Sequence, residues 1–255
     1  MRYPPARELA WSLVGAVALV ALILLMPLAG AAPQAPPAAL IAAYALVLLP
    51  LPLLLHGFLL GSRGHATPRL LVLGAVSAAL GFPLALLARP EALEGGSGVL
   101  VLIALSVANL SRILAAACVG ISLARHVESV GVILIIVAAA IVSDLFSVFA
   151  GPTRALMRED SPLLDVLLLV FPTFGSALGF GLGVSDFIFL ALFAAASRFL
   201  NLRYAATLLG VCFAAFLALT AGLLLERPLP ALPFVALAFV FVNSDLIVAS
   251  LAGRR

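Results

Sequence analysis

Apolar runs of membrane-spanning length follow one another along most of this chain, and only short polar connectors separate them. A helix that crosses the hydrocarbon core of a bilayer needs about 20 mostly apolar residues, since each residue adds about 1.5 Å. The chain is 65% hydrophobic and 10% charged, whereas a soluble domain carries about 25% charged residues. The sequence therefore predicts an all-α polytopic membrane protein in a lipid bilayer. The expected spans are 9–31, 38–61, 69–88, 98–124, 129–150, 179–199, 204–225 and 230–251.

The polar residues exclude several other classes of protein. The formal charge of +3 requires no nucleic-acid partner, because arginine at loop ends is what membrane topology demands. Cys118 and Cys212 both lie in apolar runs, so we expect free thiols and not a disulfide or metal pair. The histidines lack metal-ligand spacing, and no cofactor is expected. The basic residues are all arginine, which with abundant Ala, Leu and Pro favours a prokaryotic cell membrane.

The distribution of arginine predicts the orientation of the chain. Short cytoplasmic loops carry an excess of basic residues. With eight spans, both termini lie on one face, together with Arg2, Arg7, Arg63, Arg69, Arg125, Arg198, Arg203, Arg254 and Arg255. The opposite face carries Arg89, Arg154, Arg158 and Arg227. Both termini are therefore expected in the cytoplasm.

The stretch 163–200 does not fit a simple pattern of spans. It is almost entirely apolar and glycine-rich in its first half, too long for one span, and without room for a turn between two. We therefore expect 163–175, "LLDVLLLVFPTFG", to be a short strand-like or re-entrant piece. Non-helical backbone at membrane depth is tolerated only against protein or a water-filled cavity. The alternative is an extension of the helix that follows.

Three aspartates lie within apolar runs: Asp144, Asp186 and Asp245. Asp144 lies about seven residues before the end of its span, and Asp186 about seven residues after the start of the next. The two spans run antiparallel, so both carboxyl groups are expected roughly 10 Å below the same membrane face, at about 1.5 Å per residue. Asp245 lies near the opposite face and is not expected to join them.

Depth alone leaves three functions open for Asp144 and Asp186. Two adjacent carboxyl groups share a proton, so one can activate a water while the other protonates a carbonyl, as in aspartic proteases. Each aspartate can instead make a helix-to-helix hydrogen bond. A proton relay in a transporter also places acids in mid-membrane. Arg112, in the middle of a span, also needs a partner or a polar cavity, and a structural tie is favoured over catalysis.

Three local motifs favour the first of these functions. They are "IVSDLFSVFAGPTRAL" at 141–156, "LGVSDFIF" at 182–189 and "PLPALPFVALAF" at 228–239. In order and spacing they resemble the presenilin and signal peptide peptidase family of intramembrane aspartyl proteases, with its "YD", "GxGD" and "PAL" motifs. The resemblance covers 128–255 and leaves 1–127 as scaffolding helices. It implies a bundle of about eight or nine spans, substrates that are transmembrane helices or remnant signal peptides, and no metal or organic cofactor.

The resemblance also assigns residues. It implies that Asp144 and Asp186 are catalytic and that 165–172, "DVLLLVFP", pairs with an unwound substrate as an added strand. The supporting positions implied by the family motifs are Ser143, Leu168, Val170, Gly183, Ser185, Pro230, Ala231, Leu232 and Pro233. Two of them depart from the pattern. Ser143 replaces the usual tyrosine, and Ser185 replaces the second glycine of "GxGD", so an inactive binding or chaperone-like relative is the alternative function.

Overall fold

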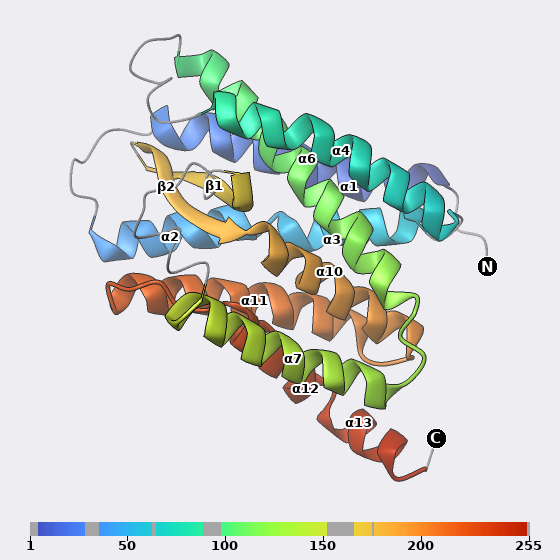
Figure 1. Ribbon diagram of the computed structural model, residues 1–255. Helices are drawn as coiled ribbons and strands as arrows, with labels where there is room; N and C mark the ends of the chain where they lie inside the picture. Colours follow the sequence, from blue (N-terminus) through green and yellow to red (C-terminus); the bar gives the residue numbers. More distant parts are fainter. Residues whose placement is uncertain are drawn as a thin grey trace.

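Helices make up most of the chain, and a two-stranded hairpin lies among them (Figure 1). The computed structural model describes residues 5–28, 36–62, 65–88, 98–151, 166–174 and 176–253. The first half comprises α1 (Pro5–Leu25), a short 3-10 helix η1 (Met26–Leu28), α2 (Pro37–Leu48), α3 (Leu51–Gly61), α4 (Thr67–Leu87) and α6 (Gly98–Ala124). The second half comprises α7 (Val130–Phe149), β1 (Leu168–Thr173), β2 (Ser176–Gly183), α10 (Val184–Phe199), α11 (Tyr204–Leu224), α12 (Leu232–Val242) and α13 (Ser244–Leu251).

The helices have the length and composition of membrane spans. Among the described residues, five helical stretches are long and apolar enough to cross a bilayer, one of them the combined α2–α3 run Pro37–Gly61. The pair α12–α13, bent by 69°, adds a sixth if it is one span. The apolar part of α1 and the 16-residue α10 are shorter than a full crossing. A multi-pass, mainly helical membrane protein is therefore supported, while eight or nine spans stays a prediction.

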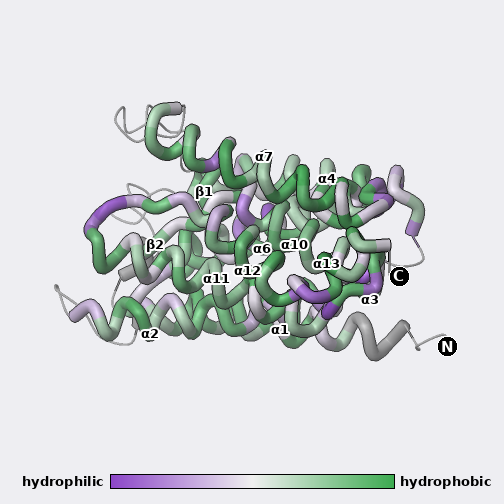
Figure 2. Tube along the Cα trace, turned by 90° about the horizontal axis from the view of Figure 1, so that it is seen from below, coloured by the Kyte–Doolittle hydropathy of each residue, from purple (hydrophilic) through white to green (hydrophobic). Residues whose placement is uncertain are grey.

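The outer surface is apolar, as contact with lipid requires. Figure 2 shows hydrophobic positions along the lengths of the helices, with hydrophilic positions mostly toward the ends of the bundle. Ile135 and Phe146 on α7 and Phe241 on α12 are 71%, 62% and 83% exposed. Large apolar side chains exposed over whole helices would favour aggregation in water, but a bilayer solvates them. In Figure 1, α1 begins and α13 ends at the same end of the bundle, in keeping with an even number of crossings.

The hairpin corrects part of the predicted span 179–199. β1 and β2 pair antiparallel, with Leu169 opposite Leu182 and Phe171 opposite Phe180, so 179–183 is strand and the helix begins only at Val184. The expectation of a strand-like piece within 163–175 is confirmed by β1, and the alternative helical extension is wrong there; residues 163–165 lie outside the described part. The backbone groups of this glycine-rich stretch that face β1 bond to the opposite strand, which satisfies them without a helix.

The helix α6 lies at the centre of the molecule and packs against α4 and α10. Its contact with α10 is very close at Gly120, where an added Cβ would meet the Ile188 carbonyl oxygen and lie 2.9 Å from the Leu192 nitrogen. Gly74 and Gly81 of α4 approach α6 in the same way, beside Cys118 and Arg112. Small residues of this kind allow helix backbones to come close in a membrane, where van der Waals packing holds helices together.

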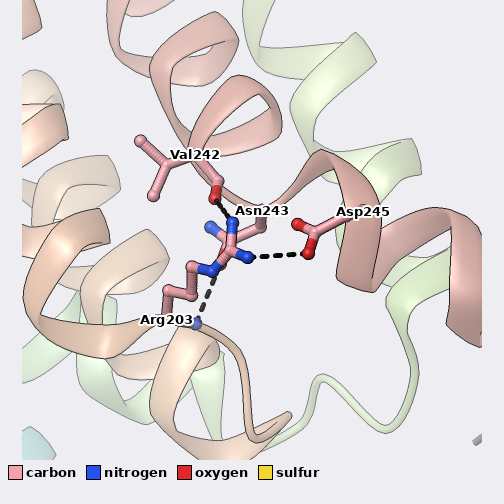
Figure 3. Close-up of polar contacts among 4 residues, drawn as sticks. All are labelled: Arg203, Val242, Asn243 and Asp245. Carbon is pink, nitrogen blue, oxygen red and sulfur yellow. Dashed lines mark hydrogen bonds and ion pairs between the residues drawn. The ribbon is translucent and has the colours of Figure 1, made fainter.

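The last helix is broken at Asn243, and Figure 3 shows the polar contacts around the break. The fully buried Asn243 side chain accepts a hydrogen bond from the Arg203 backbone N–H at 2.9 Å and donates to the Thr207 hydroxyl at 2.8 Å. Arg203 also forms a 2.7 Å ion pair with Asp245. Arg203 precedes α11, so Asp245 lies at the turn between α10 and α11, away from the other two acids. The prediction that it stands apart is confirmed.

Candidate functional site

A cavity of about 610 Å³ lies where α7, α11, the hairpin and the start of α10 meet the segment before α12. Asp144 and Asp186 both line it. The other lining residues come from six stretches of the chain: Tyr44, Val148, Leu167, Leu168, Phe180, Gly181, Leu182, Gly183, Val184, Ser185, Ile188, Ala218, Leu219, Gly222, Arg227, Pro228, Leu229, Pro230 and Ala231. Residues that the sequence separates by more than 80 positions thus enclose one space.

Asp144 reaches the cavity from α7, a helix whose opposite face is largely exposed. Its Oδ2 accepts a hydrogen bond of 2.9 Å from the backbone N–H of Leu232, the first residue of α12. The first N–H groups of a helix have no partner within the helix, and the helix dipole favours a negative charge there. The carboxylate of Asp144 therefore ties α7 to the start of the last helix.

Asp186 occupies the first turn of α10, directly after β2. Its Oδ2 accepts a hydrogen bond of 3.0 Å from the backbone N–H of Gly183, three residues earlier. This is one half of the capping-box arrangement, in which an acid at the third helical position bonds back to the residue before the helix. The side chain is 9% exposed. Figure 1 shows that β2 leads α10 to begin near the middle of the bundle, and Asp186 belongs to the first turn of that helix.

The predicted membrane depth of Asp186 was based on a wrong secondary structure. It assumed a helix from 179, but a strand advances about 3.3 Å per residue against about 1.5 Å for a helix. The eight residues of β2 place Asp186 deeper than the helical count implies. The two acids nevertheless line one cavity.

The two carboxyl groups share a pattern of hydrogen bonding. Each uses Oδ2 to accept a backbone N–H at the start of a helix. Within the part of the chain that the structure describes, neither Oδ1 has a hydrogen-bond partner. One face of each carboxyl group is thus fixed by backbone, and the other oxygen is available to the cavity. Two carboxyl groups that line one cavity can exchange a proton through water in that space.

The structure brings some of the predicted supporting residues to the cavity and not others. Gly183, Ser185, Pro230, Ala231 and Leu168 line it, and Leu232 contributes the N–H that Asp144 accepts. Pro233 follows in the first turn of α12 but is not a lining residue.

Two further predicted residues lie elsewhere. Ser143 is exposed on α7 and does not line the cavity, because it directly precedes Asp144 and neighbouring helical residues point in different directions. Val170 is also outside the cavity, and its carbonyl accepts a 2.6 Å hydrogen bond from Asn109 Nδ2. Neither residue reaches the space that the two aspartates share.

Sequence reasoning missed several residues of the site. Tyr44 comes from α2, and its ring lies 4.2 Å, centroid to centroid, from that of Phe180. Arg227 is exposed and lines the cavity, although the sequence predicts only an ordinary loop residue at this position. Outside the cavity, the sequence analysis also assigned no function to Asn109, although it stands three residues before Arg112 in an otherwise apolar span.

The described residues contain no cluster of three or more His, Cys, Asp or Glu side chains able to hold a metal ion. Comparison of the chain with protein-family models, with curated proteins and with solved structures gave no match.

Proposed function

We propose that this chain is an intramembrane aspartic endopeptidase in which Asp144 and Asp186 form the catalytic pair. The observation that carries the proposal is the shared cavity, which both carboxyl groups line in the part of the bundle that the apolar helices surround. In the proposed reaction one carboxylate takes a proton from water, which attacks the peptide carbonyl carbon. The other carboxyl group gives its proton to the carbonyl oxygen, which forms a tetrahedral intermediate. The peptide C–N bond then breaks as the first acid passes its proton to the leaving amine nitrogen, and the second acid takes back a proton from a hydroxyl group of the intermediate as the new carboxyl group forms. No metal or organic cofactor takes part.

The proposed substrates are transmembrane helices or remnant signal peptides, and the fold is proposed to be presenilin-like. A helix buries its peptide carbonyls in its own hydrogen bonds, so a substrate helix must be unwound before a carboxyl pair can act on it. The cavity suits an unwound peptide because Gly181 and Gly183 of β2 add no side chain to its wall and leave their backbone open to the space. Pro228 and Pro230, which lack backbone N–H groups, line the wall on the α12 side. The proposed location is a prokaryotic cell membrane with both termini in the cytoplasm.

A non-proteolytic membrane binding or chaperone-like protein is the second candidate. The observation that favours it is the bonding of the two aspartates to the helix starts, since each carboxylate then stabilises the fold without any catalysis. The replacement of the motif glycine by Ser185 also favours a non-proteolytic protein. A proton-coupled transporter is a weaker third candidate and predicts solute flux that depends on the same acids.

Labelling with a transition-state mimic separates the protease from the second candidate. The purified protein in nanodiscs is exposed to a photoreactive hydroxyl-containing peptide isostere, with and without an excess of the unreactive compound. A protease incorporates the label, the excess compound prevents it, and Asp144→Asn and Asp186→Asn each abolish it. Asp245→Asn is the matched control and retains labelling, because Asp245 lies at the other end of the bundle in its pair with Arg203. A folded wild-type protein that takes up no label contradicts the proposal.

A further inference from the structure

Two buried polar residues on α6 lie outside the cavity but contact the hairpin that forms part of its wall. Asn109 and Arg112 are both 0% exposed and stand three residues apart, so they occupy one face of the helix. A guanidinium at this depth is costly unless its donors are satisfied. The hydrogen-bond acceptors of Arg112 therefore indicate which part of the fold this residue holds in place.

The acceptors include three carbonyl groups of one short segment, 166–170, which leads into β1. Arg112 Nη1 donates to the carbonyl oxygens of Val166 at 3.1 Å and Leu168 at 2.7 Å. Asn109 Nδ2 donates to the carbonyl oxygen of Val170 at 2.6 Å. Arg112 Nη2 also donates to Asn109 Oδ1 at 2.8 Å, which links the two side chains into one unit. We call Asn109 and Arg112 the α6 clamp.

The spacing of these carbonyls identifies the edge of the hairpin that the clamp occupies. Along a strand, the backbone groups of alternate residues point to opposite sides within the sheet. Leu168 and Val170 of β1 therefore direct their carbonyls to one side, toward α6, and the carbonyl of Val166, just before the strand, is bonded from the same side. Leu169 and Phe171 direct theirs to the other side, where they face Leu182 and Phe180 of β2. The clamp supplies to β1 the donors that a third strand would supply.

The remaining edge of the hairpin belongs to β2 and adjoins the catalytic candidates. By the same alternation, Gly181 and Gly183 direct their backbone groups away from β1. Both line the cavity, and the Gly183 N–H already bonds to Asp186. An unpaired strand edge is a template for another extended chain. With the outer edge of β1 held by α6, a peptide that enters the cavity meets only the β2 edge.

We propose that Asn109 and Arg112 are positioning residues that hold the outer edge of β1, so that the hairpin is formed before a substrate arrives and offers β2 as its one receptive edge. The effect of these residues on cleavage rests on the proposed protease function. Their effect on the stability of the hairpin does not depend on that function. The α6 clamp replaces the earlier expectation that Leu168 and Val170 pair with substrate through this edge, since their carbonyls are already bonded to α6.

Hydrogen exchange tests the clamp without any proteolysis. Backbone amide exchange of β1 and β2 is measured in nanodiscs, in the absence of substrate, for the wild type, Asn109→Ala and Arg112→Leu. Loss of the clamp is expected to speed exchange in the hairpin at least about tenfold, because its outer edge is released, while α11 is unchanged. Ser106→Ala is the matched control, since Ser106 is buried on the same helix but its hydroxyl bonds only to the Leu102 carbonyl of α6. Unchanged exchange in both clamp variants overturns the proposal.

If Arg112→Leu does not fold, Asn109→Ala decides the outcome alone, because it removes the bonds of Asn109 to the Val170 carbonyl and to Arg112 but leaves the guanidinium with its acceptors on Val166 and Leu168. Product analysis by mass spectrometry then tests the consequence for cleavage. Asn109→Ala is expected to raise KM and spread the cleavage over neighbouring peptide bonds. A purely structural role would reduce the amount of folded enzyme and leave KM and the cleavage position as they are. A wild type that cleaves nothing while the clamp variants lose hairpin protection overturns the protease and upholds the clamp.

Discussion

The backbone N–H of Leu232 donates a 2.9 Å hydrogen bond to Asp144 Oδ2, so a carboxylate on α7 caps the first turn of α12. The "PAL" segment at Pro230–Leu232 is thus tied directly to one of the two candidate catalytic acids. The bond holds the acid at the cavity wall and assigns Asp144 a structural function in addition to the proposed chemical one. These two functions are separable by mutation.

Replacement of Asp144 by asparagine or by alanine separates them. Asparagine keeps an oxygen that accepts the Leu232 N–H, and it is as good a helix-start acceptor as aspartate. We expect Asp144→Asn to unfold at nearly the wild-type temperature and Asp144→Ala to lose about 1 kcal/mol, while both lose cleavage. Thermal unfolding in detergent, read by circular dichroism, measures the difference. Equal destabilisation by the two variants would contradict this function of the bond.

A larger residue at Gly120 is expected to separate α6 from α10. In Gly120→Ala the new Cβ meets the Ile188 carbonyl oxygen and lies 2.9 Å from both Ala191 Cβ and the Leu192 nitrogen. Two of these atoms belong to the backbone and cannot rotate away, so we expect a loss of about 1–3 kcal/mol in the free energy of unfolding.

Gly61→Ala is the control for Gly120, because a Cβ there has nothing within 4 Å and the change is expected to be neutral or stabilising by up to about 1 kcal/mol. Unfolding by a denaturing detergent measures both variants. If Gly120→Ala were as stable as Gly61→Ala, the close approach of α6 and α10 would be wrong.

The break in the last helix depends on the amide of Asn243 more than on the neighbouring ion pair. Asn243→Leu removes bonds to the Arg203 N–H and the Thr207 hydroxyl and leaves both without this partner. We expect a loss of about 2–4 kcal/mol, because unsatisfied buried groups cost more than a bond contributes. Asp245→Asn is expected to cost less than about 1 kcal/mol, since the side chains of its pair with Arg203 are 50% and 54% exposed. The reverse order of the two unfolding midpoints would contradict this account.

Ser185 is expected to be compatible with activity. Its side chain is exposed at the cavity wall in the first turn of α10, so a hydroxymethyl group there displaces solvent and not a neighbouring helix. We expect Ser185→Gly to leave the cleavage rate little changed and Ser185→Leu, which fills the cavity, to lower it at least about tenfold. Steady-state cleavage by the purified variants measures this, and a large gain of activity in Ser185→Gly would show that the serine is inhibitory.

The helical elements were the most predictable part of the fold. Runs such as 98–124 and 204–225 differ from the observed helices by one residue or none at each end, because apolar composition and length alone specify a helix in lipid. The span 179–199 was only partly right. "SALGFGLG" is apolar enough to resemble the start of a span, and its strand conformation depends on pairing with β1, which local composition does not encode.

The placement of Asp144 and Asp186 in one cavity could be anticipated from motif order, but the contacts of the site could not. The sequence marked Arg112 as a residue in need of a partner, while its acceptors are carbonyls of Val166 and Leu168, more than 50 positions away. Every residue has a backbone carbonyl, so the sequence does not show which carbonyls a side chain will bond. The α6 clamp could therefore be identified only in the folded structure. The same holds for Leu232, whose side chain gives no sign that its N–H bonds to Asp144.

Cleavage of a reporter helix tests the central claim most directly. The wild type, Asp144→Asn, Asp186→Asn and the control Asp245→Asn are reconstituted into liposomes with a single-span reporter, and products are quantified over time. The account predicts cleavage by the wild type and by Asp245→Asn, with a loss of at least about 10³-fold in each of the other two. Cleavage at the wild-type rate by both Asp144→Asn and Asp186→Asn would contradict it.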